Sequence, residues 1–282
     1  MSIPVDFGEA MTAWAQRTPA VKALVLIGSR ERKATDEIWR ADPESDWDFQ
    51  IITSAAGRFS NSDWTREIGK NFEIRAYASR VARIGGVPKV NAIFTGVETD
   101  FVILSAGMMR LLKWLVLLGR HRMEGKVRRG LQDLAIVIRP GWRFLHGSEA
   151  WDPFYRKVVA EVPDLRLSDE AARGLAHAFA CEQLWTLRKI ARGELSAAQR
   201  MLHRELAETN FRLLHELKLR RSERSFPEGR RIERVASARE LEAVCVRATL
   251  DAGQLRAAVD HSATTCERLM RDLVGETWRR LV

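Results

Sequence analysis

The sequence predicts an α+β fold, with an N-terminal mixed β-sheet and flanking helices followed by an all-α helical bundle. Strand-like apolar runs are confined to the first half of the 282 residues, where they alternate with short helical patterns. After residue 150, apolar residues recur at spacings of three and four, which is the period of one helix face. This length suits one large domain or two ordinary ones. We therefore expect one domain over 1–150 and a second over 151–282.

The elements of the first half follow from local patterns. Residues 24–27 form an uninterrupted apolar run, which is typical of a buried strand. Ser62 is a candidate N-cap, with Asp63 in the first turn after it. In chain order, we expect a helix over 5–17, strands over 21–27 and 46–53, a helix over about 63–70, strands over 90–95 and 99–104 around Gly96, helices over 107–118 and 124–137, and a strand over 142–145.

The second half carries four amphipathic patterns. Gly193 is expected to end one helix and Ser196 to cap the next, and Pro227 breaks the pattern again. We expect a bundle of four to five helices.

The formal net charge is +9. A basic surface suits an anionic ligand such as a nucleotide, or a nucleic acid. The basic residues are nevertheless spread along the chain, a pattern that also fits an arginine-rich composition with solvated helix faces. Both interpretations stay open at this point.

Several features predict a cytoplasmic protein with no membrane partner. Three cysteines without CxxC spacing indicate buried free thiols in a reducing compartment. The first ten residues lack the pattern of a signal peptide. The most apolar stretch, 101–118, is interrupted by Arg110 and Lys113 and is too short to span a bilayer.

Three acidic residues form a candidate metal site. Asp46 and Asp48 stand two apart on a predicted strand, so their side chains point to the same side. Asp100 lies on a later strand and joins them if the two strands are neighbours. Carboxylates held side by side repel one another unless a cation lies between them. We therefore expect one or two Mg²⁺ ions here, at a phosphoryl-transfer centre.

A turn directly after the first strand is a candidate phosphate site. Gly28 allows a phosphate to approach the backbone, and Ser29 adds a hydroxyl group. A helix beginning near Arg30 would direct its N-terminal amides at the same anion. Each part alone has a simpler interpretation as a turn or a solvated strand end, whereas their ordered combination favours a nucleotide site.

These motifs resemble the nucleotidyltransferase superfamily related to DNA polymerase β. The matching residues are Gly28-Ser29-Arg30, Ser45-Asp46-Trp47-Asp48 and Asp100. More narrowly, the chain resembles the aminoglycoside 6-adenylyltransferase (streptomycin adenylyltransferase) branch, which Arg192-Gly193-Glu194-Leu195 also matches. The resemblance implies a Mg²⁺-dependent enzyme that transfers AMP from ATP to a hydroxyl of a small molecule and releases pyrophosphate. An aminoglycoside such as streptomycin is one candidate acceptor.

The resemblance also implies roles for individual residues. Asp46, Asp48 and Asp100 would be the catalytic and metal-binding residues. Gly28, Ser29 and Arg30 would bind the nucleotide cofactor. Residues 1–150 would be the nucleotidyltransferase catalytic domain and 151–282 the acceptor-binding domain, with a small hydroxylated acceptor in the cleft between them.

Two points depart from the family pattern. Sixteen residues separate Ser29 from Asp46, a long insertion beside the phosphate site. No motif specifies a base for the acceptor hydroxyl. Glu182, Glu194 and Glu205 are candidates, although a surface ion pair with a neighbouring arginine is the favoured interpretation of each.

The acceptor itself stays open. An aminoglycoside is polycationic, and the basic balance of the chain argues against one unless the pocket is locally acidic. A protein or RNA acceptor is the alternative, in a toxin–antitoxin or nucleic-acid-related role. Nucleic acid is not favoured, because the main basic cluster, between 220 and 234, also fits a solvated loop. The three intact acids disfavour a non-catalytic binding protein.

Overall fold

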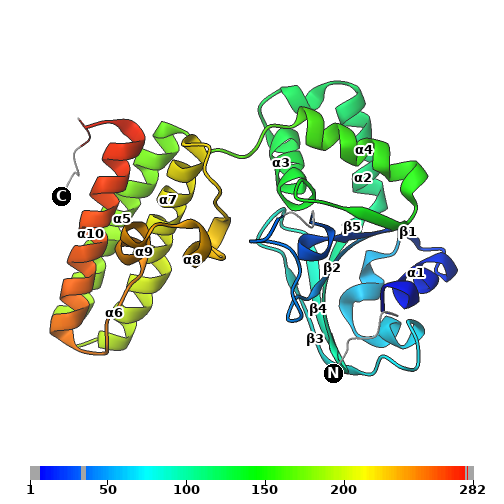
Figure 1. Ribbon diagram of the computed structural model, residues 1–282, viewed down its shortest axis with the longest axis horizontal. Coiled ribbons are helices and arrows are strands. Elements are labelled where there is room, and N and C mark those ends of the chain that lie inside the picture. Colours follow the sequence, from blue (N-terminus) through cyan, green and yellow to red (C-terminus); the bar gives the residue numbers. More distant parts are fainter. Residues whose placement is uncertain (1–6, 33–35, 277, 279–282) are drawn as a thin grey trace. The chain divides into compact units, whose positions relative to one another are not determined.

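The computed structural model of the chain describes residues 7–32, 36–276 and 278, and these fall into two compact units, Met1–Leu165 and Arg166–Val282 (Figure 1). The sequence pattern placed the boundary near 150. In the structure it falls after helix α4 (Ser148–Glu161), because Trp151 and Tyr155 of this helix are buried in the core of the first unit. We call the two parts the sheet unit and the helical unit.

One mixed sheet organises the described part of the sheet unit. Its strands stand in the order β3-β4-β5-β2-β1-β6. Only β2 and β5 are parallel neighbours among the described strands, and the other adjacent pairs are antiparallel. The strands are β1 (Val21–Ile27), β2 (Trp47–Thr53), β3 (Ile74–Val81), β4 (Pro88–Phe94), β5 (Val97–Ser105) and β6 (Arg143–His146). All except β3 were expected from the sequence, each within about two residues.

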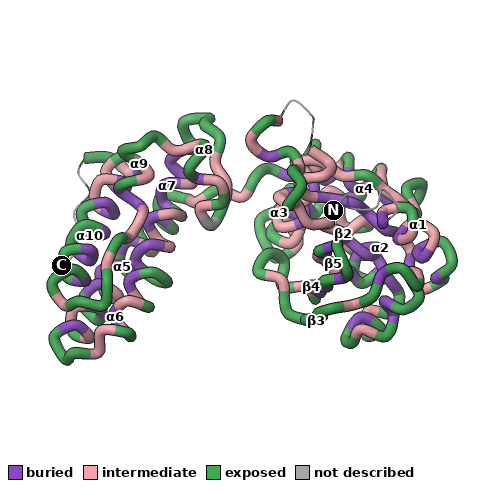
Figure 2. The backbone as a smooth tube through the Cα atoms, turned by 60° about the horizontal axis from the view of Figure 1, so that its bottom comes forward, coloured by how far each residue is buried: buried purple, intermediate pink, exposed green. Residues whose placement is uncertain are grey.

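Helices cover both faces of this sheet (Figure 1). Helix α1 (Phe7–Arg17) packs on one face, against Phe49 and Ile51 of β2. Helices α2 (Ala106–Leu117), α3 (Lys126–Ile138) and α4 cover the other face, which includes Ile52. Because side chains alternate along β2, this strand contributes residues to two separate cores. In Figure 2 the buried residues follow the strands and the inner sides of these helices.

The segment after β2 corrects one expectation. In place of a helix over 63–70, the structure has a short 3₁₀ helix, Asp63–Glu67, and the Ser62 side chain makes no capping hydrogen bond. Trp64 explains the difference, because it is buried in the core, with its ring centroid 5.1 Å from that of Phe101. Its indole Nε1 also donates to the Tyr77 hydroxyl at 3.1 Å. This anchoring holds the segment in a tight turn.

The helical unit has no strand among its described residues. Its elements are α5 (Asp169–Ala191), α6 (Leu195–Met201), a π-helical turn (Leu202–Ala207), α7 (Glu208–Arg220), a 3₁₀ turn (Pro227–Gly229), α8 (Ile232–Val235), α9 (Ala238–Val244) and α10 (Ala252–Val274). Gly193, with φ +72°, follows the end of α5 as expected. Ser196 lies inside α6 and does not cap it.

Two further findings concern exposure. Of the three cysteines, only Cys266 is buried, whereas Cys245 is half-buried and Cys181 is exposed, so burial was wrongly expected for two of them. Within the described ranges, none of the helices has the length and apolar character needed to cross a membrane.

A buried carboxylate fixes the start of the helical unit. The Glu216 side chain is 4% exposed and accepts a hydrogen bond from Arg166 Nη2 at 2.9 Å. It also accepts from the Leu167 amide at 2.9 Å and from Arg220 Nε at 3.0 Å. Burial by itself raises the pKa of Glu216, but these hydrogen bonds outweigh it and hold the pKa below its ordinary value of 4.5.

Replacing this carboxylate is expected to destabilise the chain. Glu216→Gln should lower the free energy of unfolding by about 2–3 kcal/mol at neutral pH, because two arginines lose a buried anionic partner. The contribution of Glu216 is present in full above its unfolded pKa. It is lost as the pH falls through the lowered folded pKa, so the two proteins should converge in acid. Urea unfolding followed by far-UV circular dichroism measures the difference.

Asp272→Asn is the matched control. Asp272 pairs with Arg221 at 3.3 Å, but these side chains are 38% and 46% exposed. The control should change the free energy of unfolding by less than about 0.5 kcal/mol. Equal losses in the two variants would contradict a special role for Glu216.

Candidate active site

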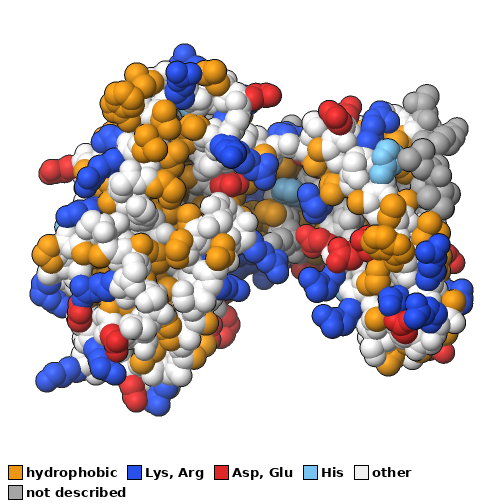
Figure 3. Space-filling model, turned by 180° about the vertical axis from the view of Figure 1, so that it is seen from behind, with side chains coloured by type: hydrophobic (Ala, Val, Ile, Leu, Met, Phe, Trp, Pro, Cys, Tyr) orange, Lys and Arg blue, Asp and Glu red, His pale blue; other side chains and the backbone are white. Residues whose placement is uncertain are grey.

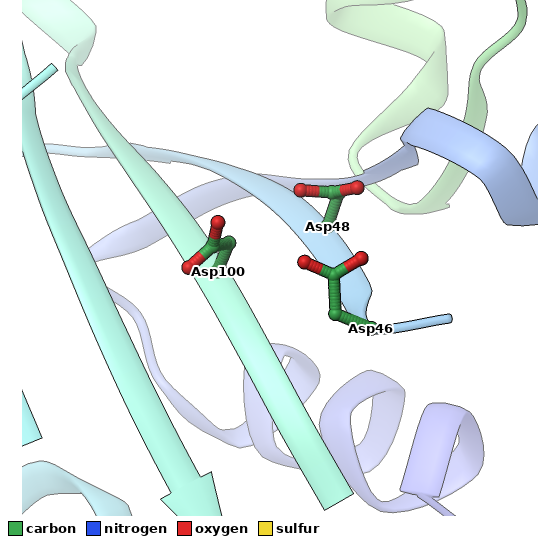
Figure 4. Close-up of side chains that lie close together, drawn as sticks. All are labelled: Asp46, Asp48 and Asp100. Atoms are coloured by element: carbon green, nitrogen blue, oxygen red, sulfur yellow. The ribbon is translucent and has the colours of Figure 1, made fainter. Parts of the chain in front are cut away.

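The parallel pairing of β2 with β5 assembles the three acids. Asp48 stands opposite Asp100 in the register, and Asp46 lies just before β2. One carboxylate oxygen from each of the three lies within 4.8 Å of the others. Figure 4 shows the carboxyl groups gathered on one side of the two strands. The geometry that the sequence predicted is therefore present, and the role of the acids as metal ligands stays a prediction.

The opposite face of the same strands is apolar. Trp47 stacks on Phe49 with ring centroids 5.9 Å apart, and Phe49 stacks on Phe101 across the strand pair at 5.4 Å. These rings belong to the core that contains α1. Because the side chains alternate, anchoring the rings on one face fixes the acids on the other.

Beyond Asp48, the sheet face that carries the acids is buried. Gln50, two residues further along β2, is 2% exposed. Its Oε1 accepts a hydrogen bond of 2.8 Å from the Tyr155 hydroxyl on α4. Burial raises the pKa of Tyr155, so its hydroxyl stays protonated and donates. The acids thus occupy the open end of a face whose interior is covered.

The turn after β1 lies directly against the acids. Gly28 has φ +78°, and a Cβ at this position would overlap the Asp48 carboxylate. Ser29 Oγ is buried and has no hydrogen-bond partner among the described residues. The helix expected from Arg30 is only a single 3₁₀ turn, Gly28–Glu31. An anion held here would therefore meet the amides of one turn, without the field of a longer helix.

Arg30 holds the loop that carries the acids. Its Nε donates to the Asp46 carbonyl at 3.0 Å, and its Nη2 donates to the Ser45 carbonyl at 2.5 Å. The guanidinium lies 4.5 Å from the centroid of the Trp47 ring. Burial lowers the pKa of Arg30, and attraction to the neighbouring aspartates opposes this. These contacts show a positioning role, and nucleotide binding by Arg30 stays a prediction.

Two residues of the site were missed in the sequence. Lys89 and Asn91 lie on β4, and Asn91 stands opposite Asp100. Asn91 Nδ2 donates to Asp100 Oδ1, and Lys89 Nζ lies 2.5 Å from Asp100 Oδ2. Both oxygens of this carboxylate are therefore contacted from β4. The sequence could have indicated both residues, because the turn at Gly96 sets which residues of the hairpin face each other.

The residues present fit a divalent cation with a bound phosphate. Three carboxylates supply the hard oxygen ligands that Mg²⁺, Mn²⁺ and Ca²⁺ prefer. Beside them, the unpartnered Ser29 hydroxyl supplies a hydrogen-bond group, and the missing side chain of Gly28 leaves room for the Asp48 carboxylate. A metal ion would also relieve the repulsion between the acids.

The three candidate bases differ in their surroundings. Glu194 pairs with Lys189 at 2.5 Å and with Arg192 at 2.9 Å, and its hydrogen bond with Lys189 lowers its pKa. Burial raises the pKa of Glu182, and repulsion from Glu205 adds to this effect. Glu205 also lines a pocket of about 220 Å³ at the π-helical turn, together with Arg200 and Arg204. Glu194 is thus an ordinary ion pair, whereas Glu182 and Glu205 form an acidic pair.

Comparisons with known proteins give structural matches only. No protein-family model and no curated protein matches the chain. An aminoglycoside 6-adenyltransferase from Bacillus subtilis is similar in structure, with 12% identity, a TM-score of 0.33, and coverage of 94% of this chain and 86% of that chain. A nucleotidyltransferase-like protein from Exiguobacterium sibiricum 255-15 also has 12% identity and a TM-score of 0.33, with coverage of 94% and 74%.

The packing of Gly28 against Asp48 gives a stability prediction. Gly28→Ala should destabilise the chain by more than the roughly 1–2 kcal/mol expected for alanine in a left-handed conformation, because the new methyl group also displaces the Asp48 carboxylate. Urea unfolding of the purified variant measures this loss.

Gly96→Ala is the control for the backbone. Gly96 has φ +79°, almost the same as Gly28, but a Cβ there would meet nothing within 4 Å. It should show the conformational penalty alone. If the two variants lose the same free energy of unfolding, the close approach of Gly28 to Asp48 does not contribute to the destabilisation.

Proposed function

We propose that this protein is a Mg²⁺-dependent nucleotidyltransferase that transfers AMP from ATP to a hydroxyl group of a small molecule and releases pyrophosphate. The observation that supports this most is the cluster of Asp46, Asp48 and Asp100 beside the Gly28-Ser29 turn. The cluster offers hard oxygen ligands, and the turn offers backbone amides and an unpartnered hydroxyl. A nucleoside triphosphate with its metal ion satisfies both parts at once.

The reaction exchanges a phosphoanhydride bond of ATP for a phosphate ester of the acceptor. The acceptor oxygen attacks the α-phosphorus of ATP, the bond from that phosphorus to the bridging oxygen of the β-phosphate breaks, and pyrophosphate leaves. The acceptor hydroxyl loses its proton in the same step. The bound metal ion supplies charge neutralisation at the phosphate oxygens.

The protein contributes alignment and electrostatics. Asp46 and Asp48 hold the metal-bound triphosphate from β2, and Asp100 faces them from β5, where it also positions the attacking hydroxyl. Gly28 and Ser29 hold the terminal phosphates. Arg30 keeps the Asp46 loop in place through the carbonyl contacts described above. Alignment of this kind supplies much of the rate in phosphoryl transfer.

A cationic small molecule, such as an aminoglycoside, is our preferred acceptor class. The acidic pair of Glu182 and Glu205 on the helical unit would attract amino groups, and Arg200 and Arg204, which line the pocket with Glu205, would bind the carboxylates of this pair or a phosphate. Within the basic cluster between 220 and 234, Arg220 pairs with Glu216 and Asp169, and Arg221 pairs with Asp272. On the face drawn in Figure 3, basic side chains are interspersed with acidic ones. These observations favour a small molecule over the alternative of an RNA or protein acceptor.

The acids are expected to be essential for transfer. Asp48→Asn and Asp100→Asn should each lower transfer by at least about 100-fold, because each removes one anionic metal ligand. The measurement is incorporation of label from α-labelled ATP, with Mg²⁺, into a panel of streptomycin, other aminoglycosides, tRNA and candidate proteins.

Asp63→Asn is the matched control, because Asp63 is an exposed surface residue with a 3.8 Å contact to Arg66. It should keep full transfer. The proposal fails if the wild-type chain neither binds ATP nor releases pyrophosphate with any acceptor. It also fails if both site variants keep their turnover. Labelling of tRNA or a protein alone would instead establish the alternative acceptor class.

The acidic pair gives a separate prediction about the acceptor. Replacing both Glu182 and Glu205 with glutamine should raise the KM for an aminoglycoside by about tenfold, through the loss of charge attraction. Binding of Mg²⁺ and ATP should not change. Glu194→Gln serves as the control, because Glu194 is already engaged by Lys189 and Arg192. An unchanged KM in the double variant would remove the acidic pair from the acceptor site.

A further inference from the structure

The Lys89 ammonium group contacts one member of the acidic cluster. Its Nζ is 2.5 Å from Asp100 Oδ2, and the two side chains are only 22% and 16% exposed. Lys89 and Asn91 are two apart on β4, so they share the sheet face on which Asp100 lies. The protein therefore supplies a cation of its own at a place where three carboxylates converge.

The two contacts on Asp100 have different physical effects. Asn91 donates a neutral amide hydrogen to Oδ1, which fixes the orientation of the carboxylate without changing its charge. Lys89 adds a positive charge at Oδ2 and so relieves the repulsion among the acids. A metal ion bound by Oδ2 would be repelled by this ammonium group, because two cations in contact with one carboxylate oxygen lie only a few ångström apart.

The ammonium group is able to leave. Lysine carries its charge at the end of a flexible four-carbon stem, and this side chain is in partial contact with solvent. Leaving has a free-energy cost as long as no other anion replaces Asp100. A triphosphate bound beside the cluster provides that anion, since an ammonium group binds phosphate oxygens as a point charge.

We propose that Lys89 is an exchangeable countercharge that couples metal binding to triphosphate binding. Without nucleotide, it neutralises Asp100 and weakens the binding of a divalent cation. When the metal ion arrives with a triphosphate, Lys89 moves from Asp100 to the phosphate oxygens. This inference rests on the proposed function, since it assumes that the three acids hold a metal ion. It gives Lys89 two alternative anionic partners, Asp100 and the triphosphate, and makes it disfavour metal binding without nucleotide.

The test measures binding and needs no turnover. Mn²⁺ alone is titrated into the full chain, with free Mn²⁺ followed by electron paramagnetic resonance. The titration is repeated with adenosine 5′-(α,β-methylene)triphosphate, which cannot transfer AMP. Lys89→Met should bind Mn²⁺ alone about tenfold more tightly than the wild type, and the metal-dependent binding of the analogue should be about tenfold weaker. Lys89→Gln should behave in the same way.

Three controls separate charge from packing. Lys89→Arg keeps the positive charge and should keep the weak binding of Mn²⁺ alone. Asn91→Ala removes a neutral donor from the same carboxylate and should not raise the affinity for Mn²⁺. Lys70→Met removes an exposed lysine of the same unit and should match the wild type. Far-UV circular dichroism verifies that each variant is folded.

The outcomes distinguish this inference from the proposed function. If the folded Lys89→Met and Lys89→Gln variants bind Mn²⁺ alone no more tightly than the wild type, Lys89 is only a structural ion pair and the inference is overturned. The proposed function then stands as long as the wild type binds Mn²⁺ with the analogue. If the wild type binds neither Mn²⁺ nor the analogue, the proposed function itself fails.

Discussion

The site depends on one parallel strand pairing, β2 beside β5. It places Asp48 directly opposite Asp100, and like charges in directly opposed positions destabilise a sheet. The pairing persists because its other face is rich in apolar contact, with the Phe49 and Phe101 rings stacked across the two strands. The same register therefore secures the core on one face and forces carboxylates together on the other. The need for a cation at the site is a consequence of how the sheet is packed.

Two cationic side chains of the protein lie at this site, and they differ in how they are held. Arg30 lies at the β1 side, where its guanidinium is fixed by two backbone carbonyls and the Trp47 ring. These contacts hold the Arg30 side chain in the loop. Lys89 lies at the β4 side and contacts a carboxylate through a single flexible stem. A fixed guanidinium can stabilise the loop without competing for a ligand oxygen, whereas the lysine occupies one of the oxygens that a metal ion would use.

The sequence predicted those parts of the site that depend on short spacing or on an apolar run. The Gly28-Ser29 turn and the pair of Asp46 and Asp48 are of this kind. The hairpin around Gly96 was also expected, but its first strand was started at residue 90, one position after Lys89. Extending that strand and counting across the turn would have set Asn91 opposite Asp100. Strand β3 was missed because most of its residues are exposed, so the apolar alternation that indicates a strand is absent.

Helix α4 shows why local sequence patterns do not determine where the first unit ends. Its amphipathic spacing is the same as that of the bundle helices, and spacing does not say which core a helix joins. The buried side chains of α4, Trp151 and Tyr155 among them, pack in the core of the sheet unit, and one of their partners lies 105 residues earlier in the chain, where Gln50 continues the acid-bearing face. A buried amide oxygen needs a donor, and Tyr155 supplies its hydroxyl from α4. Because Gln50 lies two residues from Asp48 on one strand, the helix that packs in this core also covers the face next to the site.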